Sequence, residues 1–292
     1  MVIWKMAQGP VIMVDPLADG FWKEHAFVRI RGRSRIPEEP EQILLQNRIY
    51  MGGVRSQDDI FEGHPTYEEA GVPSRDEVRA LATRHMVGAP AEEIEAATAA
   101  FLANLSDDRN RSSMVSSIAA KLDAQYSGSS ILSFFREIDQ QRAWASYGEG
   151  GKGHAFVFDF RTPWPLVCGL GMPPIDAVPF PVKYVPPGTI PSIQINFAPQ
   201  NPDDGWRDIT AALLMKAELW SDQKEERLIR VGIPQGLVEF PSESLRAVVL
   251  GYDTPDEDVT LFKDLRSRRA EPIPLYRLEA DRHLRTLRPV LI

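Results

Sequence analysis

The segment around residues 216–231 carries the side chains best suited to chemistry. Gln223, Glu225 and Arg227 alternate along the chain, so a strand beginning near residue 223 directs all three to one face. That face continues into apolar residues and is expected to meet the core, where a carboxylate and a guanidinium need pairing or a ligand. Glu225 is therefore either neutralised by Arg227 or directed into a cleft. We take Gln223, Glu225 and Arg227 as the candidate catalytic residues.

The residues just before this strand add two side chains of interest to the same region. The sequence predicts a long helix over 204–221, which places Lys216 and Trp220 four residues apart on one helical face. Trp220 and Trp144 both carry apolar bulk beside polar neighbours, so both indoles are expected to be buried close to a central sheet.

The glycine-rich segment Gly148–Gly153 matches G-x-G-x-x-G but lacks the context of a nucleotide-binding loop. A dinucleotide fingerprint needs a strand before the glycines and a helix after them, whereas here a helix precedes and a strand follows. A P-loop needs Ser or Thr after its lysine, but Lys152 is followed by Gly153. The segment is predicted to be a helix-to-strand turn.

Other common centres find no support. No G-x-S-x-G elbow is present. Asp58, Asp59 and Glu62 lie near His64, but the spacing is not that of a metal site, so no metal is predicted. Asp59 and Glu62 are expected to cap a helical segment or to pair with an arginine.

The composition narrows the class of protein. The 292 residues contain 33 Lys and Arg against 41 Asp and Glu, a formal net charge of −8. This balance argues against a dedicated nucleic-acid or membrane-surface binder. The single cysteine, Cys168, excludes an internal disulfide. No targeting segment or membrane span is evident, so we expect a cytoplasmic location and no membrane partner.

The pattern of elements predicts an α+β fold with a central mixed or antiparallel sheet. The chain is expected to form one domain over 1–292, with a helical insertion at about 66–128. The predicted strands are 26–32, 48–51, 154–160, 180–185, 225–232 and 245–250. The predicted helices are 41–47, 74–86 with a Ser74–Glu77 capping box, 90–105 opened by Pro90, 111–126, one capped by Asp139 and ended by Gly148, 204–221 and 254–268.

Four segments in order resemble the bacterial domain of unknown function 2971 family. Trp220-x-x-Gln223-x-Glu225-x-Arg227 is similar to its W-x-x-E-x-E-x-R signature, with Gln223 in place of the first Glu. The other three are residues 57–62 after 48–50, Trp144-Ala-Ser-Tyr147 followed by Gly153, and Leu245–Gly251. The resemblance covers roughly 26–265, and the family has no assigned activity, so it implies a fold more than a function.

The layout also resembles that of ADP-ribosyltransferases, which implies NAD as a substrate. Those enzymes have an early strand with a cationic residue and a late (E/Q)-x-E, the form of Gln223-Lys224-Glu225. A carboxylate such as Glu225 stabilises the oxocarbenium-like centre formed when the nicotinamide–ribose bond breaks. Arg29 is expected to bind the pyrophosphate, and Tyr50, Trp144 or Tyr147 to contact the cofactor through an aromatic ring.

Two alternatives remain open. The first is a non-catalytic recognition module of a bacterial defence or stress system, whose charges hold the fold. The second is nucleic-acid processing, since residues 261–292 carry eight Lys and Arg against four Asp and Glu. A transferase, acting in defence or as a toxin, would need a macromolecular acceptor, protein or nucleic acid. The sequence identifies neither that acceptor nor an oligomeric state.

Overall fold

The main sheet is mixed and confirms the predicted α+β class. The computed structural model describes residues 2–6, 9–13, 21–33, 38–56, 64–167, 174–199, 204–281 and 286–292. In spatial order the sheet runs β10 (Phe180–Pro181), β14 (Glu225–Arg230), β6 (Ser130–Phe135), β3 (Ala26–Arg31), β7 (His154–Asp159), β16 (Leu245–Leu250), β17 (Leu275–Asp281) and β18 (Thr286–Leu291). β16 and β17 run parallel, and the other neighbours on this path run antiparallel.

A branch leaves the main path at β6. β4 (Arg48–Gly53) pairs with the first residues of β6 and, on its other side, with β15 (Gly236–Glu239). β3 pairs with β6 only at the last residue of β6, where Val28 faces Phe135. The sheet therefore forks between β3 and β4. This fork positions one of the predicted site residues, Arg29.

Four two-stranded sheets surround the main sheet. They pair β1 (Val2–Met6) with β2 (Gly9–Met13), β11 (Lys183–Val185) with β13 (Met215–Ala217), β12 (Ser192–Ile195) with β5 (Thr66–Glu69), and β8 (Trp164–Leu166) with β9 (Ile175–Ala177). The short 3-10 segments are η1 (Val54–Ser56), η2 (Glu149–Gly151), η3 (Glu218–Gln223) and η4 (Ser242–Ser244).

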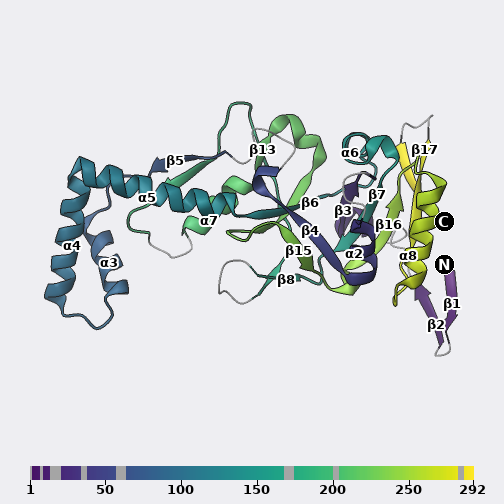
Figure 1. The fold of residues 1–292 in the computed structure, drawn as a ribbon, viewed down its shortest axis with the longest axis horizontal. Coiled ribbons are helices and arrows are strands. Elements are labelled where there is room, and N and C mark those ends of the chain that lie inside the picture. Colours follow the sequence, from purple (N-terminus) through teal and green to yellow (C-terminus); the bar gives the residue numbers. More distant parts are fainter. Residues whose placement is uncertain are drawn as a thin grey trace.

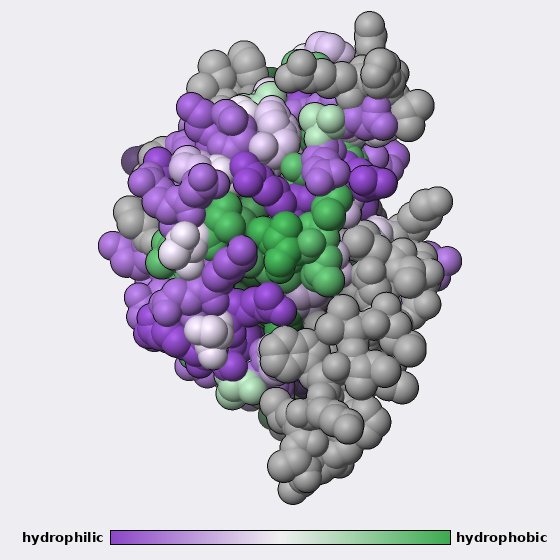
Figure 2. Space-filling view, turned by 90° about the vertical axis from the view of Figure 1, so that its right-hand side faces the viewer, coloured by the Kyte–Doolittle hydropathy of each residue, from purple (hydrophilic) through white to green (hydrophobic). Residues whose placement is uncertain are grey.

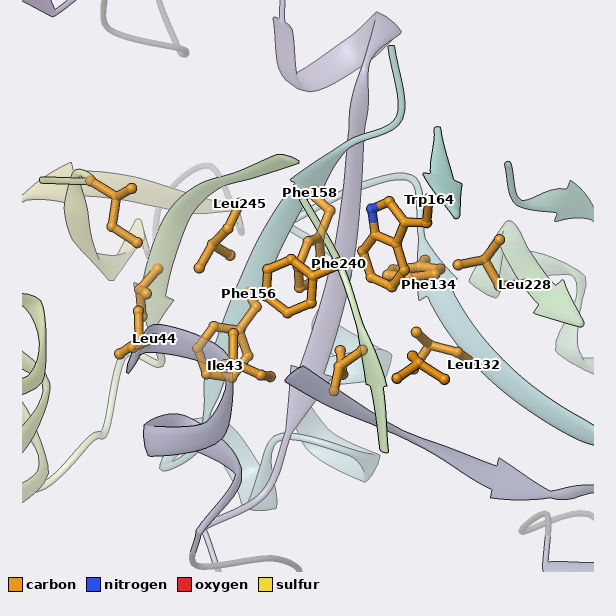
Figure 3. Close-up of a cluster of buried hydrophobic side chains, with 14 of the residues drawn as sticks. Ile43, Leu44, Leu132, Phe134, Phe156, Phe158, Trp164, Leu228, Phe240 and Leu245 are labelled. Carbon is orange, nitrogen blue, oxygen red and sulfur yellow. The ribbon is translucent and has the colours of Figure 1, made fainter. Parts of the chain in front are cut away.

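Helices cover both faces of the main sheet. α2 (Glu39–Gln46) and α8 (Asp256–Arg268) contribute to one apolar cluster, α6 (Gln141–Ser146) to a second and α7 (Asp204–Leu213) to a third. The first cluster contains a group of aromatic rings, in which Trp164 contacts Phe134, Phe158 and Phe240, as Figure 3 shows. A short helix, α1 (Phe21–Glu24), precedes β3.

Three helices extend away from the main sheet, as Figure 1 shows. They are α3 (Arg75–His85), α4 (Ala91–Ser106) and α5 (Asp108–Ser127), and they occupy most of the predicted insertion 66–128. The capping box is confirmed, because the Ser74 hydroxyl accepts from the Glu77 backbone N–H while the Glu77 side chain accepts from that of Ser74. Pro90 lies at the N-cap of α4.

An apolar area lies at the end of the molecule opposite to α3 and α4. Figure 2 views the end where α8 and the C-terminus lie, and shows apolar residues surrounded by hydrophilic ones. Leu261 of α8 and Leu291 of β18 are 45% and 48% exposed.

Several predicted boundaries are wrong where distant strands decide the backbone. The helix predicted over 204–221 ends at Leu213, because residues 215–217 pair with β11 instead. The strand predicted over 180–185 divides at Val182 into β10 and β11, which belong to different sheets. The cap of α6 is Gln140 rather than Asp139, and it makes no side-chain capping bond.

Candidate functional site

Glu225 is the centre of a buried cluster of charged side chains. Its Oε2 lies 2.7 Å from the Lys216 ammonium nitrogen, and its Oε1 lies 2.7 Å from the Arg227 Nε. The Lys216, Glu225 and Arg227 side chains are only 7%, 3% and 2% exposed. Each carboxylate oxygen thus has its own cationic partner, away from water.

Three elements position this cluster, which we call the Glu225 triad (Lys216, Glu225 and Arg227). β14 begins at Glu225 and directs it to the same face as Arg227, while β13, paired with β11, carries Lys216. The Glu225 backbone N–H donates to the hydroxyl of Tyr184, and Arg227 donates to the main-chain oxygen of Leu213 at the end of α7. The helical i, i+4 relation predicted for Lys216 and Trp220 is wrong because the chain is extended at Lys216.

The triad keeps Glu225 ionised. Burial alone would raise the pKa of this carboxyl, but Arg227 and Lys216 oppose it and hold the pKa at about 2, below the usual 4.5. A carboxylate with such a pKa carries no proton at neutral pH. It therefore suits electrostatic binding rather than proton transfer.

Gln223 and Tyr147 lie beside the triad. Gln223 is buried at the end of η3, and its amide Nε2 donates to the Tyr147 hydroxyl over 3.3 Å. Gln223 is not part of the strand, since Lys224 takes a left-handed conformation between it and Glu225. The indole of Trp220 covers Lys216, with the ammonium nitrogen 5.4 Å from the ring centroid. Trp220 is partly exposed rather than buried as predicted, because η3 lies at the surface.

Arg29 belongs to a second buried cluster, which we call the Arg29 triad (Arg29, Glu39 and Arg31). Its Nε lies 3.3 Å from one oxygen of Glu39, and the Arg31 Nε lies 3.2 Å from the other. The Arg29 guanidinium also donates to the main-chain oxygens of Ser133 on β6 and Tyr50 on β4. It therefore fills the fork of the sheet and bonds carbonyl groups on two strands that separate there.

Burial lowers the pKa values of Arg29 and of the neighbouring His154. Desolvation, with a contribution from Arg31, lowers the pKa of Arg29 to about 9, although Glu39 opposes the shift. His154 on the adjacent strand is buried as well, and desolvation lowers its pKa from 6.5 to about 4. His154 is therefore a neutral imidazole at pH 7.

The two triads lie on opposite faces of the sheet. The register places Glu225 opposite Phe135, and Phe135 opposite Val28, so these three residues share one face. Successive residues in a strand point to opposite faces, and Arg29 follows Val28. Arg29 accordingly lies on the face covered by α2 and α8, and Glu225 on the face covered by α6.

The structure thus brings together only part of the predicted site. Glu225 pairs with Arg227, and Gln223 contacts Tyr147, whereas Arg29 lies on the opposite face of the sheet from Glu225. Trp144 is completely buried, and its indole N–H donates to the Ile138 main-chain oxygen over 2.6 Å, which assigns its ring to the core.

Tyr50 has a structural role, and three residues of the two triads and their surroundings were not predicted from the sequence. Tyr50 contributes its main-chain oxygen to Arg29, which is a structural contact. Lys216, Tyr184 and Glu39 were missed as site residues. Lys216 had a local signal, since it precedes the Trp220–Arg227 motif. Glu39 lies on α2, which follows β3, whereas Tyr184 comes from a segment 41 residues before Glu225.

The glycine-rich segment is a helix-to-strand turn, as predicted. It lies at the crossing of three chain segments, where a Cβ at Gly153 would collide with the Arg31 main-chain oxygen and one at Gly251 with that of Gly151. These glycines allow the backbones to approach closely. Close packing therefore accounts for the G-x-G-x-x-G match.

Two arginines of the C-terminal region serve internal contacts. Arg269 donates to main-chain oxygens of Leu44 and Ser242, and Arg277 to that of Thr254. Arg288 pairs with a neighbouring glutamate. Arg282 and Arg285 lie outside the described residues. The contacts that are described favour a structural role over phosphate binding.

Asp58, Asp59 and Glu62 of the acidic turn lie outside the described residues, and so does Cys168. Within the part of the chain that the structure describes, no group of three or more His, Cys, Asp or Glu residues is placed to hold a metal ion. Among the described helices, none is both long and apolar enough to cross a membrane.

Comparison with known proteins leaves the resemblance to the domain of unknown function 2971 family as a prediction. No family model, no curated protein and no solved structure matches the chain.

Proposed function

We propose that this protein is a non-catalytic recognition module, one of the alternatives that the sequence leaves open. The observation that carries this proposal is the double pairing of Glu225 with Lys216 and Arg227. A cationic transition state such as an oxocarbenium ion gains little from a carboxylate already neutralised in this way.

The charges of the Glu225 triad suit binding better than turnover. With a pKa of about 2, Glu225 serves as neither general acid nor general base near neutral pH. Arg29 and Trp144 are committed to structural contacts. The proposal keeps the role in a bacterial defence or stress system that the sequence leaves open.

The second candidate is the ADP-ribosyltransferase-like, NAD-consuming enzyme. The proximity of Gln223, Glu225 and Tyr147 favours it, because these residues retain the order expected of a late (E/Q)-x-E beside an aromatic ring. In this reading NAD is a substrate and a protein or nucleic acid is the acceptor.

A turnover assay tests the choice between the two. Wild-type protein is incubated with NAD alone and with candidate protein and nucleic-acid acceptors, and released nicotinamide is measured. We expect no release above the protein-free control. Release that disappears in a folded Glu225→Gln variant contradicts the recognition module and establishes the transferase.

A further inference from the structure

His154 is a buried histidine whose ring lies against two phenylalanine rings. It is 6% exposed, and the ring centroids of Phe156 on the same strand and Phe262 on α8 lie 5.2 and 4.8 Å away. Among the residues that the structure describes, its Nε2 has no hydrogen-bond partner. A protonated imidazole donates from both nitrogens, so it would be poorly accommodated in this position.

The charged groups beside the ring do not compensate for its burial. Arg31 lies opposite His154 in the register of β3 and β7, and Glu39 of α2 already pairs with Arg29 and Arg31. Burial, which is the largest effect, and Arg31 oppose protonation, whereas Glu39 and Glu149 of η2 favour it. The pKa of His154 is held at about 4, and the ring is therefore neutral at pH 7.

The remaining elements next to the ring are β16 and α8. On β16, the residue opposite His154 is the apolar Leu250. On α8, the charged residues one turn before and one turn after Phe262 are Asp258, which pairs with Arg33, and Arg266. Protonation of the ring therefore adds a positive charge where the carboxylate one turn before Phe262 already has a cationic partner.

α8 covers the ring with few buried residues of its own. It buries Phe262 and Leu265, whereas the shorter helix α2 buries four residues. The N-terminal turn of α8 is held by the partly exposed Arg33, which pairs with Glu257 and Asp258. Ion pairs near the surface contribute little to stability. We therefore expect α8, rather than α2, to be the helix that uncovers the ring.

Fixed points on both sides of α8 define the segment that can open. Before the helix, the Thr254 hydroxyl donates to the Gly153 main-chain oxygen. After the helix, Arg269 donates to the main-chain oxygens of Leu44 and Ser242. Since α8 connects the parallel strands β16 and β17, its opening breaks no strand pair of the main sheet.

We propose that α8 is an acid-sensitive cover, which opens between Thr254 and Arg269 when His154 is protonated. Opening moves Phe262 away from the imidazole and admits water, so that both ring nitrogens are solvated. The aromatic rings beneath α8 then become accessible at acidic pH, whereas they are covered at neutral pH. This inference concerns the fold and is independent of the proposed recognition function.

The size of the effect follows from proton linkage. A histidine exposed by opening has the ordinary pKa of 6.5, above the value of about 4 in the closed protein, so the open form binds the additional proton. Opening therefore becomes more favourable as pH falls from about 6.5 to 4. Between pH 7 and 5 the equilibrium constant for opening should rise about 20-fold.

Hydrogen exchange followed by mass spectrometry at pH 7 and pH 5 measures this opening. The rates are corrected for the intrinsic effect of pH on amide exchange. We expect the amides of α8 to lose protection about 20-fold at pH 5. At both pH values they should exchange at least about tenfold faster than the amides of β7, because β7 opens only with the main sheet.

His154→Phe keeps an aromatic ring and removes the titration, so the protection of α8 in this variant should not respond to pH. His85→Phe makes the same change at an exposed histidine of α3 and is the matched control, which should respond as wild type. His154→Gln also lacks the titration and replaces the first variant if that variant fails to fold.

Three results would overturn this inference. The first is α8 protection in wild-type protein that does not change between pH 7 and pH 5. The second is a folded variant without His154 that keeps the full response. The third is equal protection of α8 and β7 at both pH values, which would mean that α8 opens only when the whole protein unfolds.

Discussion

The Glu225 triad and the Arg29 triad have the same charge composition, two cations around one carboxylate, but different surroundings. All members of the Glu225 triad come from residues 216–227, and a partly exposed indole covers it. The Arg29 triad joins β3 to α2 and also bonds main-chain oxygens on β4 and β6. The comparison teaches that one charge composition can be built in two ways, from residues close together in the chain or from a helix and strands that the fold brings together.

The largest expected effect comes from removing the carboxylate of the Glu225 triad. Glu225→Gln leaves Lys216 and Arg227 buried without their partner charge and should lower the free energy of unfolding by about 3–5 kcal/mol. Urea unfolding at neutral pH measures this. Gln194→Leu serves as the control for an exposed site. A loss below about 1 kcal/mol would mean that the cluster opens to water or a ligand more readily than its burial indicates.

Arg29→Met tests whether the second triad is structural. The change leaves the Ser133 and Tyr50 carbonyl groups without their guanidinium donor, so we expect a loss of about 3 kcal/mol in the free energy of unfolding. Arg29→Lys should recover only part of it, because an ammonium cannot reproduce the planar fork of donors. Full recovery by lysine would show that charge, rather than hydrogen-bond geometry, is what the fork requires.

Buried groups on the two faces of the sheet should destabilise the protein in different pH ranges. The folded pKa of His154, about 4, lies below its usual 6.5, so the unfolded chain binds the additional proton and stability falls as pH decreases from about 6.5 to 4. The folded pKa of Glu225 is also depressed, so its contribution is complete above about 4.5 and is lost as pH falls towards 2.

Across each of these pH ranges the free energy of unfolding should change by about 3 kcal/mol. Unfolding midpoints should be measured from pH 7 to 2. His154→Phe should remove the loss of stability between about pH 6.5 and 4, and Glu225→Gln should remove the loss between about pH 4.5 and 2. If His154→Phe leaves the upper range unchanged, the acid sensitivity belongs to another group.

The smallest effect is expected at the surface contact that joins η3 to α6. Arg142 and Asp222 are both about half exposed, so Asp222→Asn should change the free energy of unfolding by less than about 1 kcal/mol. A larger loss in urea unfolding would contradict a surface role for this contact.

Much of the fold follows from local sequence. The strands at 26–32 and 245–250 and the helix after Ser74 form as predicted, because apolar runs and a capping box act within a few residues. The helix predicted over 204–221 fails for the opposite reason. Residues 215–217 extend only because β11 lies beside them, and that neighbour is 32 residues earlier in the chain.

The same division applies to the candidate site. The sequence by itself determined that Glu225 and Arg227 share a strand face and need pairing or a ligand there, since alternation in a strand is a local rule. Only the tertiary structure decided that Arg227 and Lys216 both pair with Glu225 and that Arg29 lies on the opposite face of the sheet. Those outcomes depend on strand order and register, which arise from packing between segments far apart in the chain.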